Sequence, residues 1–299
     1  LTPEVILESV ETFGDRATGA FTALNSYENR VYRVVTETHG AVAVKFYRPG
    51  RWTDAQILEE HAFALELAGQ EIPVVAPRVR DDGKTLCEHA GFRFTVFPWQ
   101  PGRAGELNTR EQRTVLGRYL GRLHRVGRAS RFRERPAITV DHFGRESVAA
   151  VLDGDFLPAY LRDSYHTLTD ELLALIADRL EAVQPATLRL HGDCHLGNVL
   201  WAGDTPFLVD LDDSRSGPAV QDLWMLLSGE HAEREAQLGE VLGGYTQFME
   251  FDVAELALIE PLRTLRLLHY AAWIARRWDD PAFPAAFPWF NTPRYWEEH

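Results

Sequence analysis

The chain has 299 residues, 45% of them hydrophobic and 25% charged, which is enough apolar material for one large domain or two lobes. Its formal net charge of −13 argues against nucleic acid as a partner, and no apolar run approaches the ~20 residues that span a bilayer. Two cysteines, Cys87 and Cys194, are too few for a disulfide scaffold and fit a reducing compartment. We therefore expect a cytoplasmic monomer that binds neither nucleic acid nor membranes.

The first part of the chain is rich in β-forming residues. Alternating apolar and polar side chains predict four short strands, at 21–24, 31–35, 41–47 and 92–97. His39-Gly40 turns the second strand into the third, and a helix fits residues 54–68. Pro98 should end the last strand, because proline has no N–H to donate to a ladder. We place an inter-lobe connector at 98–102.

The remainder of the chain is mostly helical in pattern. Asn108 and Glu111 can cap a helix whose apolar face holds Leu116, Tyr119, Leu120 and Leu123. Further helices are expected at 156–183, with a break near Pro158, and at 220–227, 231–249 and 262–278. The fold class is therefore α+β, with a small antiparallel β-rich lobe over residues 1–98. A mainly helical lobe covers residues 99–299.

One segment of the second lobe carries the side chains that phosphoryl transfer needs. An apolar strand leads to His191 and Asp193, and Asn198 comes five residues after Asp193. A turn at 202–204 joins two further apolar strands, and the second of these leads into Asp210. Transfer from a nucleotide needs a carboxylate that accepts the hydroxyl proton, and an Asn and an Asp that hold Mg²⁺. Asp193 and Asp210 are thus the predicted catalytic residues, and Asn198 and Asp210 are the predicted metal ligands. The predicted cofactors are ATP and Mg²⁺. The alternative is that these residues only form a polar turn.

A lysine in the first lobe suits the phosphates of a nucleotide. Lys45 lies in the strand at 41–47, where it can reach α- and β-phosphates if a carboxylate on the next helix orients it. Glu59 and Glu60 are both available, and we choose Glu60 because Phe63 and Leu67 follow it at helical spacing. An exposed lysine on an edge strand is the alternative reading.

Two further segments should contact the nucleotide. No Gly-rich loop and no P-loop motif is present, but the segment 24–32 joins two strands, so its N–H groups and the Ser26 hydroxyl can contact phosphates. A plain polar hairpin loop is the alternative. We expect adenine at the connector, bound by backbone groups around Phe97 and Trp99.

These motifs resemble the aminoglycoside phosphotransferase and choline kinase superfamily, which has a protein-kinase-like fold. The resemblance is carried by 191–198 with Val209 and Asp210, and it extends to a bacterial branch of serine/threonine protein kinases of the stress response. The stretches that carry this second likeness are 24–32, 44–49, 57–65, 217–227 and 280–284. It implies the same roles for Asp193, Asn198, Asp210, Lys45 and Ser26.

The resemblance also implies that Asp222 is a buried acid that braces the catalytic loop through backbone N–H groups. The metal loop reads Asp210-Leu211-Asp212 rather than D-F-G, so a switch that depends on a phenylalanine is not implied.

Other readings of the same residues remain open. His191, Cys194 and His195 could bind zinc, and Asp193-Cys194-His195 matches the start of a binuclear metallophosphatase motif, although its later G-N-H-[DE] part is missing. We prefer His191 as a residue that holds the loop by hydrogen bonds. Cys194 could make activity redox-sensitive, but a small buried side chain is the preferred reading.

The last long helix pattern contains aromatic and basic residues. Leu265, Leu268, Trp273 and Ile274 are expected in the core. Four arginines are expected in solvent, where any of them could pair with an acidic substrate: Arg263, Arg266, Arg276 and Arg277.

The predicted function is transfer of the γ-phosphoryl group of ATP to a hydroxyl, with serine or threonine of a protein as the favoured acceptor. A small-molecule kinase for an amino alcohol, a sugar or an aminoglycoside is the alternative, since its catalytic residues would be identical. A pseudokinase scaffold is the second alternative, which the complete set of catalytic residues disfavours.

Overall fold

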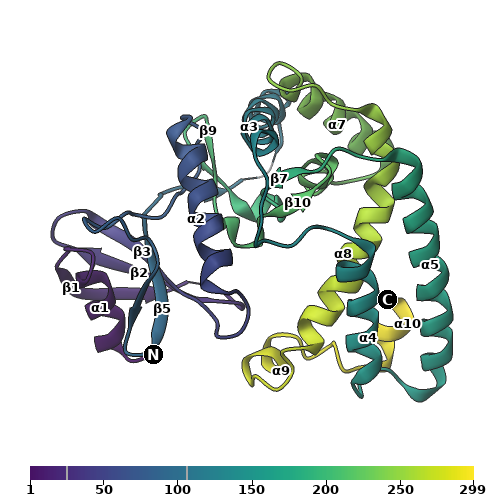
Figure 1. Ribbon diagram of the computed structural model, residues 1–299, viewed down its shortest axis with the longest axis horizontal. Helices are drawn as coiled ribbons and strands as arrows, with labels where there is room; N and C mark the ends of the chain where they lie inside the picture. The colour runs from purple at the N-terminus through teal and green to yellow at the C-terminus, as the bar shows by residue number, and fades with distance from the viewer. Residues whose placement is uncertain (25, 106) are drawn as a thin grey trace.

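The computed structural model describes residues 1–24, 26–105 and 107–299. Asn25, which belongs to the predicted phosphate-contacting loop, and Glu106 lie outside the described residues. Two lobes lie side by side, a small one built on a sheet and a larger helical one (Figure 1). The sheet has five antiparallel strands in the order β1-β2-β3-β5-β4.

The elements of the small lobe follow from its strand patterns. Its helices and strands are α1 (Pro3–Glu11), β1 (Ala17–Ala23), β2 (Arg30–Thr36), β3 (Gly40–Phe46), α2 (Asp54–Gly69), β4 (Cys87–His89) and β5 (Phe92–Pro98). Val42 and Val44 on β3 pack with Val10 of α1 on one face of the sheet. Successive side chains of a strand alternate between faces, so Lys45 points to the opposite face, toward the larger lobe.

Helix α2 links the packing of the two lobes. It begins with a capping box in which Thr53 and Gln56 satisfy each other's backbone N–H groups. Its buried Phe63 and Leu67 belong to the same hydrophobic cluster as Leu116 of the larger lobe. The predicted lobe boundary near residue 98 stays a prediction, and in the packing the end of α2 shares its core with the second lobe.

The larger lobe contains the remaining elements. Its helices are α3 (Arg110–Ala129), α4 (Glu146–Asp153), α5 (Arg162–Val183), α6 (Val220–Trp224), α7 (His231–Tyr245), α8 (Ile259–Ala275), α9 (Ala282–Ala286) and α10 (Pro293–Glu298). Its strands are β6 (Arg103–Ala104), β7 (Leu188–Leu190), β8 (Val199–Ala202), β9 (Thr205–Leu208) and β10 (Arg215–Gly217). They form two small sheets, β10-β7 and β6-β8-β9. In Figure 1, β7 and β10 lie between α3 and α8, and β9 lies beside α2.

Helices α3 and α7 pack closely because α3 carries glycine at the contact. A Cβ at Gly117 would lie 2.0 Å from the carbonyl oxygen of Val241. Any larger side chain would therefore push α7 away from the core that supports the catalytic loop.

Several predicted boundaries are wrong by a few residues. The cap of α3 is Thr109 with Gln112 rather than Asn108 with Glu111, because the Thr109 hydroxyl accepts from the Gln112 N–H. Helix α8 spans Ile259–Ala275 rather than 262–278. Strand β5 ends at Pro98, as predicted, and Pro98 pairs with Val42 as its last residue. The break predicted near Pro158 is confirmed, since helix α5 begins only at Arg162, after Pro158 and a short 3-10 turn.

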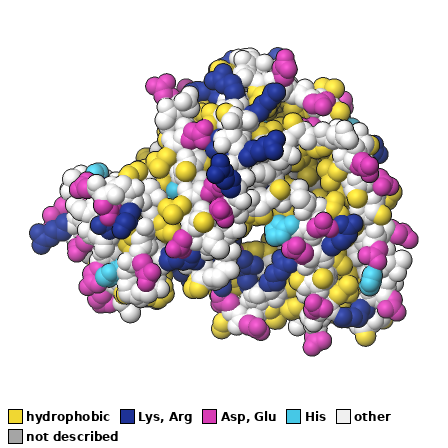
Figure 2. Space-filling model, in the orientation of Figure 1, with side chains coloured by type: hydrophobic (Ala, Val, Ile, Leu, Met, Phe, Trp, Pro, Cys, Tyr) yellow, Lys and Arg dark blue, Asp and Glu magenta, His cyan; other side chains and the backbone are white. Residues whose placement is uncertain are grey.

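Four helices were not predicted from the sequence. They are α1, α4, α9 and α10, of five to nine residues each. Such short helices have little periodicity of their own and are stabilised by tertiary packing. No helix of the described residues combines the length and the apolar character of a membrane span. Figure 2 shows that the surface is hollowed between the lobes, with Lys and Arg side chains at the rim.

Candidate active site

The loop that follows β7 is held in place by one buried carboxylate. Asp222, on α6, accepts the backbone N–H groups of His191 and Gly192, each at 2.8 Å. It also pairs with Nε2 of His124 on α3 at 3.0 Å. Asp222 is fully buried, and these contacts satisfy it, so it braces the loop as the resemblance implies.

The side chain of His191 and the backbone of Gly192 also fix the direction of this loop. Gly192 has φ +86°, and a Cβ there would lie 2.1 Å from the Asp213 carbonyl oxygen. Nε2 of His191 lies 3.0 Å from the Val209 carbonyl oxygen, which ties the loop to the end of β9. The predicted role of His191 in holding the loop is thus confirmed. A zinc site there is disfavoured, because His191 and Cys194 are both fully buried in packed surroundings.

Asp193 lies in the cleft between the side chains of Arg266 and His195. Arg266, on α8, lies 2.7 Å from Oδ1 of Asp193, and Nε2 of His195 lies 3.5 Å from Oδ2. Burial raises the pKa of Asp193, but the hydrogen bond from His195 and the charge of Arg266 outweigh it and leave the pKa below its usual value. The carboxylate is therefore ionised at neutral pH, as a catalytic base must be.

Asn198 is oriented by the backbone of the same loop. Its Nδ2 donates to the Asp193 carbonyl oxygen at 2.9 Å, which leaves the amide oxygen as the atom suited to bind a cation. The Val209 N–H donates to the Asn198 carbonyl oxygen at 3.0 Å, so Asn198 lies beside the residue that precedes Asp210. The hairpin of β8 and β9 thus brings together the residues that the sequence spacing singled out.

Asp210 stands at the end of that hairpin in an uncommon backbone conformation. Its φ of +59° is left-handed, which is rare for a residue other than glycine and marks a position fixed by function or by its neighbours. Oδ1 of Asp210 lies 2.8 Å from Nζ of Lys45, while 57% of the Asp210 side chain remains exposed. Asp210 and Asn198 offer a carboxylate and an amide oxygen, the hard ligands that Mg²⁺ takes, so the residues fit that metal.

The partner of Lys45 differs from the prediction. Lys45 pairs with Asp210 and, at 3.1 Å, with Asp212, whereas Glu60 pairs with Arg135 at 3.3 Å. Burial lowers the pKa of Lys45, but the charges of Asp210, Asp212 and Glu60 outweigh it and hold the pKa above its usual value. Glu60 therefore acts on Lys45 through its charge, because Arg135 occupies its carboxylate.

Glu60 itself is buried, and burial raises its pKa to about 7 although Lys45 and Arg135 oppose the rise. Its membership of the nucleotide site stays a prediction.

Asp212 is the centre of an ion-pair network that joins the lobes. Besides Lys45 it binds Arg51, and it accepts from Nδ2 of Asn29 at 3.2 Å. Burial alone would raise the pKa of Asp212. The charges of Arg51 and Lys45 outweigh this effect and lower the pKa to about 2. The metal loop is therefore anchored to the small lobe by the residue two positions after Asp210.

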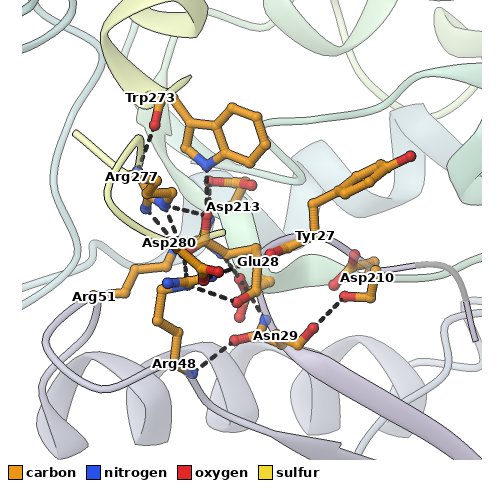
Figure 3. Close-up of polar contacts among 12 residues, drawn as sticks. Tyr27, Glu28, Asn29, Arg48, Arg51, Asp210, Asp213, Trp273, Arg277 and Asp280 are labelled. Carbon is orange, nitrogen blue, oxygen red and sulfur yellow. Dashed lines mark hydrogen bonds and ion pairs between the residues drawn. The ribbon is translucent and has the colours of Figure 1, made fainter. Parts of the chain in front are cut away.

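The loop between β1 and β2 lies over the metal loop. The Ser26 hydroxyl donates to the Asn29 carbonyl oxygen at 2.8 Å, so it closes the turn of the loop. Glu28 accepts hydrogen bonds from Trp273 and Arg277 of the large lobe and forms ion pairs with Arg48 and Arg51, as Figure 3 shows. Ser26 as a phosphate contact stays a prediction.

The predicted adenine site is at the end of β5. Phe97 pairs in register with Ala43 and lies on the same face of the sheet as Lys45, two residues after Thr95, the register partner of Lys45. The Arg33 guanidinium lies 5.2 Å from the ring of Trp99. Phe97 therefore shares a face of the sheet with Lys45, and the contact of Phe97 and Trp99 with adenine stays a prediction.

Sequence reasoning missed the basic residues of the cleft. Arg266 and Arg277, expected in solvent, pair with Asp193 and Glu28. Trp273, expected in the core, is only partly buried and donates to Glu28. Their spacing on α8 placed them on one face, but nothing in the sequence showed which acids lie opposite that face.

Cys194 is fully buried, as predicted, and burial raises its pKa well above the usual value. Such a thiol is unreactive, so the redox reading is disfavoured.

Comparisons with known proteins agree with this geometry. The model of the phosphotransferase enzyme family matches residues 20–259. The chain is 49% identical over 296 residues to stress response kinase A of Escherichia coli K12. This alignment covers 99% of this chain and 89% of that protein. The chain is 46% identical over 297 residues to the serine/threonine protein kinase RdoA of Salmonella typhimurium, which covers 99% and 90%.

Solved structures confirm the predicted fold class. The amicoumacin kinase hAmiN, solved in complex with AMP-PNP, Ca²⁺ and Ami, has a TM-score of 0.76 at 20% identity, covering 96% of this chain and 91% of that one. A microcompartment-associated aminopropanol kinase has a TM-score of 0.73 at 19% identity, covering 96% and 94%. Both share the two-lobed α+β architecture.

Proposed function

The chain belongs to the phosphotransferase enzyme family, and we propose that it transfers the γ-phosphoryl group of ATP to serine or threonine hydroxyls of a protein. The observation that carries this proposal is the linked set of Asp193, Asn198, Asp210 and Lys45 in one cleft. We further propose that it acts as a cytoplasmic monomer in a bacterial stress response, since relatives at 46–49% identity over nearly the full length are named for that role or as serine/threonine kinases.

The catalytic step would depend on positioning and charge. Asp193, ionised and facing the cleft, would accept the proton of the acceptor hydroxyl as that oxygen attacks the γ-phosphorus. Lys45 would offset the charge of the phosphates, and Asn198 and Asp210 would hold Mg²⁺. When bound, Mg²⁺ neutralises charge that develops on the phosphate oxygens.

The local charge of the acceptor side favours a protein over a cationic small molecule. The acidic net charge of the chain would attract an aminoglycoside or an amino alcohol, as it would any cation. The guanidinium of Arg266, however, lies 2.7 Å from Oδ1 of Asp193. A cationic acceptor would bring its charge next to Arg266, and this contact, rather than the distant field, decides what docks.

The proposal is tested with purified protein, radiolabelled ATP, Mg²⁺ and a generic protein substrate. Label should appear on serine or threonine and should be lost in Asp193→Ala and Asp210→Ala. Turnover of ATP with an amino alcohol or an aminoglycoside, without labelled protein, would instead support a small-molecule kinase. A pseudokinase would bind ATP without labelling any acceptor, and Asp193→Ala would leave its cellular role unchanged.

A further inference from the structure

One face of α8 runs along the cleft from the catalytic base to the loop over the metal site. Arg266, Tyr270, Trp273 and Arg277 follow one another at steps of four, three and four residues, which places them on one face of the helix and its closing turn. Arg266 contacts Asp193 at one end, and Arg277 contacts Glu28 at the other. An acceptor that reaches Asp193 therefore lies against this face.

The middle of this face is aromatic and partly open. The Tyr270 and Trp273 rings are stacked with centroids 5.6 Å apart, and Phe287 lies edge-on to both. Tyr270 is 39% exposed, and Tyr27, which packs on Phe287 from the small lobe, is 53% exposed. In Figure 3 the ring of Tyr27 points away from the ion-pair cluster around Glu28.

The cationic end of this face is incompletely used. Arg266 keeps 37% of its side chain exposed, and in the described part of the chain its ion-pair partner is Asp193. Asp193 must present an oxygen to the acceptor hydroxyl at hydrogen-bond distance during the reaction, so it has to share or give up this contact. The Arg266 guanidinium is then available to an anionic group of the acceptor, which it can bind through its fork of N–H donors.

We propose that Arg266 is a specificity-determining residue, which binds an acidic group of the acceptor close to the hydroxyl that is phosphorylated. The acceptor is thus a serine or threonine with a carboxylate or phosphate nearby, and its neighbouring apolar side chain packs on Tyr270. A guanidinium binds such a group with two parallel hydrogen bonds, which gives both affinity and orientation. This inference rests on the proposed protein kinase function.

The test uses peptides with one serine in a Gly, Ala and Tyr context. Asp, Asn or Lys is placed in turn at each of the two positions on either side of the serine. The full-length wild-type chain should phosphorylate the best Asp peptide with a kcat/KM about tenfold above that of the matching Asn peptide, a difference of ~1.4 kcal/mol. The Lys peptide should be the poorest.

Two substitutions at the same residue separate recognition from folding. Arg266→Glu should invert the order, so that the Lys peptide exceeds the Asp peptide, and Arg266→Gln should abolish the preference without inverting it. Arg276→Glu is the matched control, since Arg276 lies on the same helix, is exposed and bonds the Glu146 carbonyl oxygen instead. It should leave the preference of the wild type unchanged.

The failures of the two proposals are distinguishable. Equal rates on Asp and Asn peptides, or a profile that Arg266→Glu leaves unaltered, would overturn the role of Arg266 while the protein kinase function stands. If wild type labels no peptide but phosphorylates a small alcohol, the protein kinase proposal fails. The role of Arg266 is then tested by comparing kcat/KM for glycerate, glycerol and ethanolamine. Glycerate, which carries a carboxylate, should be the best acceptor, and a higher kcat/KM for glycerol or ethanolamine would refute the role.

Discussion

Glu28 and Arg277 form a bidentate ion pair between residues 249 positions apart in the sequence. Nη2 of Arg277 lies 2.9 Å from Oε1 of Glu28, and Nε lies 2.9 Å from Oε2. The side chain of Arg277 is only 15% exposed and that of Glu28 only 12%, so solvent screens this pair less than it screens a surface ion pair. The pair ties the segment that precedes β2 to the helical lobe (Figure 3).

Neutralising either partner should loosen the β1–β2 loop and weaken nucleotide binding. We expect Glu28→Gln and Arg277→Gln each to raise the KM for ATP about five- to tenfold with a smaller change in kcat, because the loop loses its anchor. In a double-mutant cycle the two effects should be coupled by about 1 kcal/mol.

The matched control for this loop is Arg276→Gln, which changes the neighbouring exposed arginine and should leave the KM for ATP unaltered. Additive effects of Glu28→Gln and Arg277→Gln would show that the pair does not act as a unit.

The roles proposed for Asp193 and Asp210 predict different kinetic defects. Asp193→Asn should lower kcat by about 10²–10⁴ while ATP affinity is retained, since a general base acts in the chemical step. Asp210→Asn should raise the Mg²⁺ concentration that gives half-maximal rate, because a carboxylate ligand is lost. The measurements are steady-state rates over a range of Mg²⁺ and ATP binding by titration calorimetry.

Asp204→Asn, in the exposed turn between β8 and β9, is the control for charge and should behave as wild type in both measurements. A full rate in Asp193→Asn would exclude that residue as the base.

The candidate catalytic side chains could be predicted because they lie close together along the chain. Asn198 and Asp210 flank the β8–β9 hairpin and Asp193 comes five residues before Asn198, so local spacing fixes their relative positions. The partners of Lys45 could not be predicted in the same way. Asp212 reaches it from 167 positions later in the sequence, and only the packing of the two lobes brings them together.

Contacts between distant segments also explain why the partner of Glu60 was not predicted. Helical periodicity correctly indicated that Glu60 is buried next to Phe63. It could not show that Arg135, from the segment between α3 and α4, reaches the same carboxylate. Arg266 is a parallel case, since its partner Asp193 lies on a different element.

Removing the brace under the catalytic loop should cost both stability and activity. Asp222→Ala would leave two backbone N–H groups and His124 without their buried partner, at a cost of about 3–5 kcal/mol in the free energy of unfolding. Asp222→Asn keeps an acceptor oxygen and should cost less. Urea unfolding followed by circular dichroism measures both, and an Asp222→Ala protein as stable as wild type would contradict the brace.

Two buried histidines should make the protein less stable in mild acid. Burial lowers the pKa of His61 to about 3, and nearby Lys45 and Arg135 contribute; burial and Arg215 lower that of His269 to about 3 as well. In the unfolded chain each has a pKa near 6.5, so between about pH 6.5 and 3 unfolding takes up protons that the native state does not bind. Stability is therefore retained above pH 6.5 and lost as the pH falls.

At pH 5 each histidine should lower the free energy of unfolding by about 2 kcal/mol relative to pH 7. His269→Phe should keep the stacked contact with Phe143, whose ring centroid lies 4.2 Å away, and should remove one of the two contributions. Asp212, with a pKa of about 2, adds a further loss only below about pH 4. Glu60, whose folded pKa of about 7 is above its unfolded value, takes up a proton in the native state within the window and offsets part of the histidine loss. Urea unfolding at half-unit steps between pH 5 and 7.5 gives the slopes, and parallel curves for wild type and His269→Phe would show that His269 does not carry its share.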